Sequence, residues 1–162
     1  MRTKILVPLS LSPDEQPVVD KARELALAQE YQLLLLHVVD LYQIEIAMAG
    51  AELKVDDLVA YKDQLIAQKQ RDAQAHLQKI ADELQAKGLV VAIDIEAGRP
   101  AQTIIRTVKQ HNEIAGIVMG SRHSAAMDRR FHRNIAAKVQ RKSPCPVTAV
   151  QLPARYKGSI TQ

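Results

Sequence analysis

Five short runs of apolar, branched residues alternate along the chain with longer stretches whose apolar residues recur at helical spacing. Such runs are typical of strands buried on both faces, and a helix between consecutive strands makes those strands parallel. Because crossovers of this kind are right-handed, the alternation predicts a single open, doubly wound α/β fold, with a five-stranded parallel sheet and helices on both faces. The expected strands span residues 4–9, 32–39, 89–96, 114–119 and 146–152.

Four helices are expected between these strands. The first begins at a capping box, with Ser12 as the N-cap, Pro13 at the first helical position and Glu15 three residues after the cap. The second lies within residues 51–87, which contain neither Gly nor Pro; one helix of that length would be roughly 50 Å long, so it either breaks or projects from the body. The remaining two are expected at residues 100–112 and 133–141.

Residues 40–52 have mixed composition and predict a loop of low order, with room for a helical turn. The length of 162 residues and the 47% of hydrophobic residues suit one domain, over residues 1–152, followed by a flexible tail over 153–162. The chain starts without a signal-peptide core, and no apolar run approaches the roughly 20 residues that span a bilayer. These features predict a cytoplasmic protein that does not enter the membrane.

Several kinds of chemistry are excluded by what the sequence lacks. A single cysteine, Cys145, rules out an internal disulfide framework and predicts a packed thiol, and the five histidines show no paired metal-ligand spacing. His37 lies inside a buried strand and is expected to be a hydrogen-bonded core residue. No glycine-rich dinucleotide fingerprint, Gly-Lys-Ser/Thr phosphate loop or Gly-x-Ser-x-Gly turn is present. Nothing here points to bond-breaking catalysis.

The net charge of +4 belongs to one segment. Residues 122–142 hold seven Lys or Arg and only one acid, Asp128, a net of +6 that leaves −2 for the rest of the chain. In an open parallel sheet, ligands bind beyond the carboxyl ends of the strands. The basic segment follows the fourth expected strand, so its first residues should lie at that end of the sheet.

This segment also carries a family resemblance. It reads IVMGSRHSAAMDRRFHRNIAAKVQRKSPCPVTAV and resembles the universal stress protein family, whose pattern there is Gly, two residues, Gly, nine residues, Gly, then Ser or Thr, followed by a helix and a Pro-Cys-Pro-Val strand. KILVPLSLS resembles the family's first strand and turn, LLLLHVVD its second strand, and EAGRPAQTII its third-strand exit. The likeness covers about residues 2–151.

The resemblance implies where a nucleotide would bind. Some members of the family bind ATP and others do not. In those that bind, an acid after the first strand lies near the ribose, the second-strand exit faces the adenine, and the glycine-rich loop wraps the phosphates. Carried onto this chain, the candidate nucleotide or anion-binding residues are Pro8, Leu9, Ser10, Val39, Asp40, Gly98, Gly120, Ser121, Arg122, His123, Arg133, Asn134 and Ile135.

The chain departs from the nucleotide-binding pattern at three positions. Ser10 replaces the acid, and His123 and Arg133 replace two of the three loop glycines, whereas Asn134 remains a competent helix cap. A side chain at a position that needs positive φ costs roughly 1–2 kcal/mol and fills space that glycine leaves to phosphate. We therefore expect a non-catalytic, regulatory stress-response domain that does not bind ATP in the usual family manner.

Three alternatives stay open. Arginine side chains of the 122–134 loop can grip phosphate bidentately, which would make the protein a sensor of ATP, AMP or another anion. A weak ATPase would need a metal-binding carboxylate, and Asp40 and Asp128 are the only acids near the expected strand exits. A nonspecific nucleic-acid binder would suit the basic segment, but aromatics make up only 3% of the residues.

The last expected strand is an apolar edge strand, and an unpaired edge favours pairing with another chain. The family commonly dimerises through this strand, so a homodimer is expected, with Val147, Thr148, Ala149, Val150 and Gln151 at its interface. In the alternative, the tail covers this edge in a monomer. The sequence does not identify a further protein partner.

Overall fold

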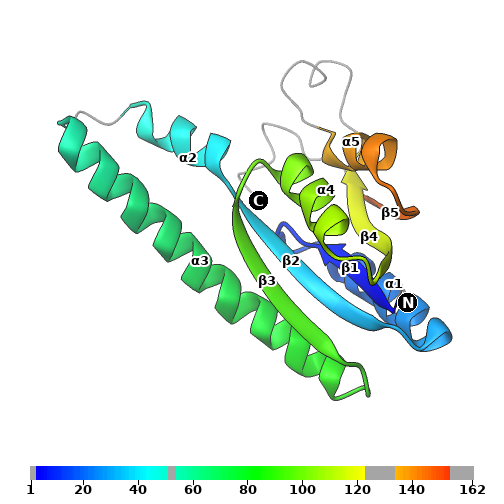
Figure 1. The fold of residues 1–162 in the computed structure, drawn as a ribbon. Coiled ribbons are helices and arrows are strands. Elements are labelled where there is room, and N and C mark those ends of the chain that lie inside the picture. Colours follow the sequence, from blue (N-terminus) through cyan, green and yellow to red (C-terminus); the bar gives the residue numbers. More distant parts are fainter. Residues whose placement is uncertain (1–2, 51–53, 123–133, 154–162) are drawn as a thin grey trace.

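The computed structural model describes residues 3–50, 54–122 and 134–153 (Figure 1). The described part contains five strands and five helices. In chain order they are β1 (Lys4–Pro8), α1 (Gln16–Gln29), β2 (Gln32–Asp40), α2 (Leu41–Met48), α3 (Val55–Gln85), β3 (Val91–Gly98), α4 (Pro100–Gln110), β4 (Ile114–Arg122), α5 (Ile135–Lys142) and β5 (Val147–Leu152). The predicted tail over 153–162 lies almost wholly outside the described residues, so it stays a prediction.

All five strands belong to one parallel sheet in the order β3-β2-β1-β4-β5. This confirms the predicted doubly wound α/β fold. The order reverses at β1, which pairs with β2 on one side and with β4 on the other. The carboxyl ends of these three strands therefore surround the switch point, where such sheets bind ligands.

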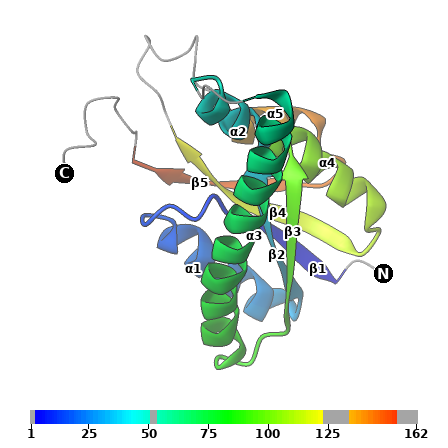
Figure 2. The ribbon, with the colours of Figure 1, turned by 90° about the vertical axis from the view of Figure 1, so that its left-hand side faces the viewer.

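Helices cover both faces of the sheet (Figures 1 and 2). On one face α1 and α3 pack over a core that includes Val7, Val18 and Leu77, none of them measurably exposed. On the other face α4 and α5 enclose a second core around Leu6, Leu36 and Ile117. The runs that predicted the strands are apolar on successive residues because each central strand contributes side chains to both cores.

The long helix is unbroken. α3 has 31 residues and is therefore about 46 Å long. Its buried residues, Ala73, Leu77, Ala81 and Leu84, all lie in its C-terminal half. The N-terminal half extends past the sheet (Figure 1). Of the two outcomes expected for this stretch, the projecting helix is the one observed.

Two local predictions were wrong. α1 begins at Gln16, not at Pro13, and its N-cap is Glu15. One bond of the predicted capping box is present, because the Glu15 carboxylate accepts from the Ser12 N–H at 3.1 Å, but the Ser12 hydroxyl donates to an Asp14 oxygen 2.7 Å away instead of capping the helix. Residues 41–48 form helix α2 where a loop was expected, because the Asp40 side chain accepts from the Tyr42 N–H at 3.0 Å and Ile44 is buried.

Candidate functional site

A pocket of about 590 Å³ opens at the carboxyl ends of β1, β2 and β4. Its size is within the range of small-molecule sites. The predicted residues that line it are Pro8, Leu9, Ser10, Val39, Asp40, Gly120, Ser121, Arg122, Asn134 and Ile135. Gly98 lies at the end of β3 and is not part of this lining. His123 and Arg133 lie outside the described residues, so the predicted crowding by their side chains stays a prediction.

Glu15 is the residue that sequence reasoning missed. Its carboxylate lies against the β1–α1 loop, residues 9–15, and is only 8% exposed. Oε1 accepts from the Leu11 N–H at 2.7 Å and the Ser12 N–H at 3.1 Å. Oε2 accepts from the Ser10 N–H at 2.9 Å and the Ser10 hydroxyl at 3.0 Å. An acidic group is thus present next to Ser10, although Ser10 itself replaces the family's acid.

The backbone of this loop is shaped around the carboxylate. Leu11 has φ of +69°, a conformation that non-glycine residues rarely adopt. When successive residues alternate between right-handed and left-handed backbone conformations, their N–H groups point toward one spot and form a concavity that binds anions. The three N–H groups of residues 10–12 converge in this way, and the anion that they bind is the chain's own Glu15.

Arg122, the predicted phosphate ligand at the end of β4, is held by other groups. Its guanidinium donates to Asp14 through both terminal nitrogens, at 2.8 and 2.5 Å, and also to the Ser12 hydroxyl at 3.0 Å. A further bond of 2.7 Å reaches the Pro153 carbonyl. These hydrogen bonds to Asp14 hold the pKa of Arg122 above its ordinary value. The interaction joins the β1–α1 loop to the end of β4 and leaves little of the guanidinium for an anion.

The two predicted glycines lie close to side chains of the chain itself. A Cβ on Gly120 would meet Leu152 Cδ1 at 2.5 Å, and a Cβ on Gly98 would meet Thr103 Oγ1 at 2.7 Å. Among the described glycines only Gly88 has positive φ. At both site positions a neighbouring side chain lies close to the glycine, so a larger residue there would require that side chain to shift.

The opposite wall of the pocket is helical and carries solvated charges. Lys69, Asp72 and His76 of α3 lie on one face of the helix and line the pocket, together with Gln43 and Ile44 of α2. Sequence reasoning did not predict these residues, because neither helix contains a motif that points to a ligand. Their participation depends on α3 lying diagonally beside the end of β2 (Figures 1 and 2).

The cysteine prediction is confirmed, whereas the histidine prediction is confirmed for the hydrogen bond of His37 but not for a place in the core, because His37 is half-buried and lines the pocket. His37 Nδ1 lies 2.8 Å from the Leu9 carbonyl, and because a carbonyl only accepts, Nδ1 carries the proton in this contact. Cys145 is a buried free thiol. Asn134 also acts as expected, since its Oδ1 accepts from the Ala137 N–H at 3.0 Å and caps α5.

The fold and the position of the pocket define a doubly wound α/β protein with a ligand site at its topological switch point. The sequence matches the model of the universal stress protein family over residues 1–151, so the chain belongs to that family. This confirms the resemblance seen in the sequence. Among curated proteins no match was found.

Solved structures share the fold. The universal stress protein UspA from Lactobacillus plantarum is 24% identical, with a TM-score of 0.73 over 93% of this chain and 99% of its own. A universal stress protein solved in complex with cAMP is 17% identical, with a TM-score of 0.61 over 91% and 96%. The Archaeoglobus fulgidus protein solved in complex with dAMP is 16% identical, with a TM-score of 0.57 over 92% and 97%.

Within the described ranges, no helix is long and apolar enough to cross a membrane. β5 pairs with β4 and, among the described residues, has no strand on its other side. Along this edge Ala149 and Gln151 are exposed, whereas Val147, Thr148 and Val150 are half-buried. The tail that the monomer alternative places on this edge lies mostly outside the described residues, so the homodimer and its alternative both stay predictions.

Proposed function

We propose that this protein is a non-catalytic regulatory member of the universal stress protein family, which works in the cytoplasm as a homodimer and does not hold ATP in the manner usual for its nucleotide-binding relatives. The observation that carries this proposal is that the Arg122 guanidinium is already bound by groups of the chain itself. Its side chain is 15% exposed and bonds with Asp14. An incoming phosphate would have to replace a bidentate carboxylate, which already matches the fork geometry of the guanidinium.

The acids of the pocket support a binding role. Asp14 pairs with Arg122 and Ser12, and Glu15 already accepts four hydrogen bonds. Neither carboxylate is placed to hold a magnesium ion against a triphosphate. The weak ATPase alternative depends on a metal-binding carboxylate from Asp40 or Asp128. Asp40 lines the pocket, but its side chain accepts from the Tyr42 N–H as the cap of α2, and Asp128 lies outside the described residues.

Calorimetry on the purified protein tests this proposal. ATP, ADP and AMP are titrated with and without Mg²⁺, after denaturation of a separate sample has shown whether a nucleotide co-purifies. We expect ATP to bind no more tightly than about 1 mM, with no dependence on Mg²⁺. Magnesium-dependent ATP binding at or below about 10 μM would overturn the proposal.

A second candidate is a sensor of an adenine mononucleotide. The pocket volume of about 590 Å³ and its apolar surface from Leu9, Val39 and Ile44 favour this candidate. Relatives with the same fold have been solved with cAMP and dAMP. It predicts that AMP binds independently of Mg²⁺ and more tightly than GMP in the same titrations. Equal dissociation constants for AMP and GMP would rule out this candidate.

The dimer is tested at the β5 edge. In a two-fold pairing of β5 with its copy, Ala149 near the middle of the strand faces the same residue of the second chain. Light scattering should give twice 18.0 kDa for the wild type, and Ala149→Arg should lower that mass because like charges would oppose each other. Ala92→Arg, at an exposed position on the opposite edge strand β3, is the matched control. A wild-type mass of one chain would contradict the dimer.

A further inference from the structure

The strongest unexplained feature is the carboxylate inside the β1–α1 loop. We propose that Glu15 is an internal anion that fills an oxyanion-binding site made by this loop, and that it is a specificity-determining residue because it keeps a ligand's phosphate or carboxylate group out of that site. The inference rests on the proposed function for the location of the ligand pocket. It adds the reason why the β1 side of that pocket does not accept an anion.

The donors form a complete site for a small oxyanion. Three successive N–H groups, from Ser10, Leu11 and Ser12, and the Ser10 hydroxyl all point at the two carboxylate oxygens, at 2.7 to 3.1 Å. Leu11 holds the positive φ that brings the N–H groups together. Donors of this number and spacing suit phosphate, sulfate or a carboxylate equally well, because each presents several acceptor oxygens to one point.

The Glu15 carboxylate makes more contacts than a helix cap requires. Glu15 is the N-cap residue of α1, yet its side chain makes no capping hydrogen bond to that helix. Its carboxylate turns back to the loop that precedes it and lies at the wall of the pocket. A capping-box Glu accepts only from the N–H of the residue three positions before it, here Ser12, whereas Glu15 also accepts from the Ser10 and Leu11 N–H groups and the Ser10 hydroxyl.

Glu15 therefore acts on a ligand by exclusion. A carboxylate offers about four lone-pair positions, and four donors already occupy them. No position is left for a ligand hydroxyl or a cation. The negative charge also repels an approaching phosphate, and Asp14 one residue away adds a second carboxylate on the same loop.

The test removes the internal anion and supplies an external one. Glu15→Ala leaves the four donors without a partner, Glu15→Gln keeps the volume but loses the charge, and Glu24→Ala makes the matched change at an exposed site on α1. The melting temperature of each protein is followed against formate, acetate and inorganic phosphate, with chloride at the same ionic strength as the reference. Calorimetry then measures inorganic phosphate and AMP.

We expect a saturable rise in melting temperature for Glu15→Ala with formate, acetate and phosphate but not with chloride. Inorganic phosphate should bind this variant at least tenfold more tightly than it binds the wild type. Glu24→Ala should behave as the wild type, and Glu15→Gln should stay unresponsive because its amide still fills the space.

Two results would overturn the inference. One is a folded Glu15→Ala protein, judged by circular dichroism, whose melting temperature and phosphate affinity do not respond. The other is an unfolded Glu15→Ala protein that neither formate nor phosphate helps to refold, whereas refolding with either anion supports the inference. Tight ATP binding by the wild type would instead overturn the proposed function, so the two failures are distinguishable.

Discussion

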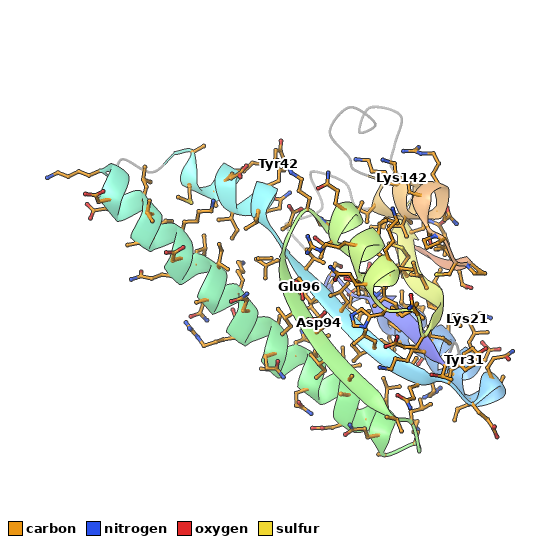
Figure 3. The ribbon with its side chains drawn as sticks, viewed as in Figure 1. Lys21, Tyr31, Tyr42, Asp94, Glu96 and Lys142 are labelled. Atoms are coloured by element: carbon orange, nitrogen blue, oxygen red, sulfur yellow. The ribbon has the colours of Figure 1, made fainter. Side chains whose placement is uncertain are left out.

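The β1–α1 loop and the β3 edge of the sheet both carry neighbouring acids, but the surroundings of these acids differ in the two places. In the loop, Glu15 is buried and meets four donors. On β3, Glu96 lies beside Asp94 on the same strand, and the nearest cation, Arg106, is 3.8 Å away (Figure 3). The hydrogen bond with Asp94, followed by burial and the Asp94 charge, raises the pKa of Glu96, which Arg106 only partly offsets.

This difference shows that carboxylates are matched by hydrogen-bond donors at the pocket but not at the edge of the sheet. At the edge, solvent screens the mismatch between two acids, so it is tolerated. At the pocket, burial makes an unmatched charge costly, and every carboxylate of the loop has donors within the chain. The loop is thus a fixed structure whose polar groups are satisfied before any ligand arrives.

The largest effect is expected from Glu15→Ala. Removal of the carboxylate leaves three backbone N–H groups and a hydroxyl without their acceptor. We expect the free energy of unfolding, measured by urea denaturation, to fall by about 2–4 kcal/mol, because each buried unsatisfied group costs roughly 1–3 kcal/mol and water replaces part of the loss. Glu24→Ala should change it by less than about 0.5 kcal/mol. A similar small change for both variants would show that the loop does not need its internal anion.

Arg122→Ala is expected to have the next largest effect. It removes the bidentate contact with Asp14 and the bond to the Pro153 carbonyl. Because the Asp14 side chain is 35% exposed, water screens part of the interaction, and we expect a loss of about 1–2 kcal/mol in urea denaturation. Arg122→Lys keeps the charge but not the two-pronged geometry and should lose about half as much. An unchanged stability for both variants would mean that the contact is a surface pair of no consequence.

The sequence was sufficient for the fold because strand burial is written in consecutive residues. Residues 33–36, for example, are four consecutive buried leucines, since both sheet faces are covered. Helix α2 could not be found in this way. Leu41, Ile44 and Met48 do have helical spacing, but the stretch is only eight residues long, and α2 is also stabilised by the Asp40 cap and by contact with α3.

The site shows the same division between local and distant information. Its place followed from topology, because the carboxyl ends of parallel strands meet at one edge of the sheet. Its chemistry did not. Ser12, Pro13 and Glu15 fit a capping box locally, but the pairing of Arg122 with Asp14 spans 108 positions and draws the Ser12 hydroxyl away from any cap. Gly120 was assigned to a ligand because Leu152, its actual neighbour, lies beyond any local pattern.

Asp94→Asn tests the other side of the comparison and is expected to have the smallest effect. In the native state the pKa of Glu96 is raised, so folding makes its proton harder to lose. Above that pKa both acids are charged and the pair destabilises the native state; as the pH falls through it, the native state takes up the proton first and the penalty disappears. The variant should therefore be more stable than the wild type at pH 7, by roughly 0.2–1 kcal/mol, since solvent screens the pair. The advantage should vanish below about pH 4, where Glu96 is protonated in both states.

Urea denaturation between pH 3 and 8 measures this stability difference, and Lys109→Gln on α4 serves as a charge-removing control. If the variant has no stability advantage at pH 7, or if its advantage grows as the pH falls, the two acids of β3 do not interact. Charge would then be as well matched at the edge as in the loop.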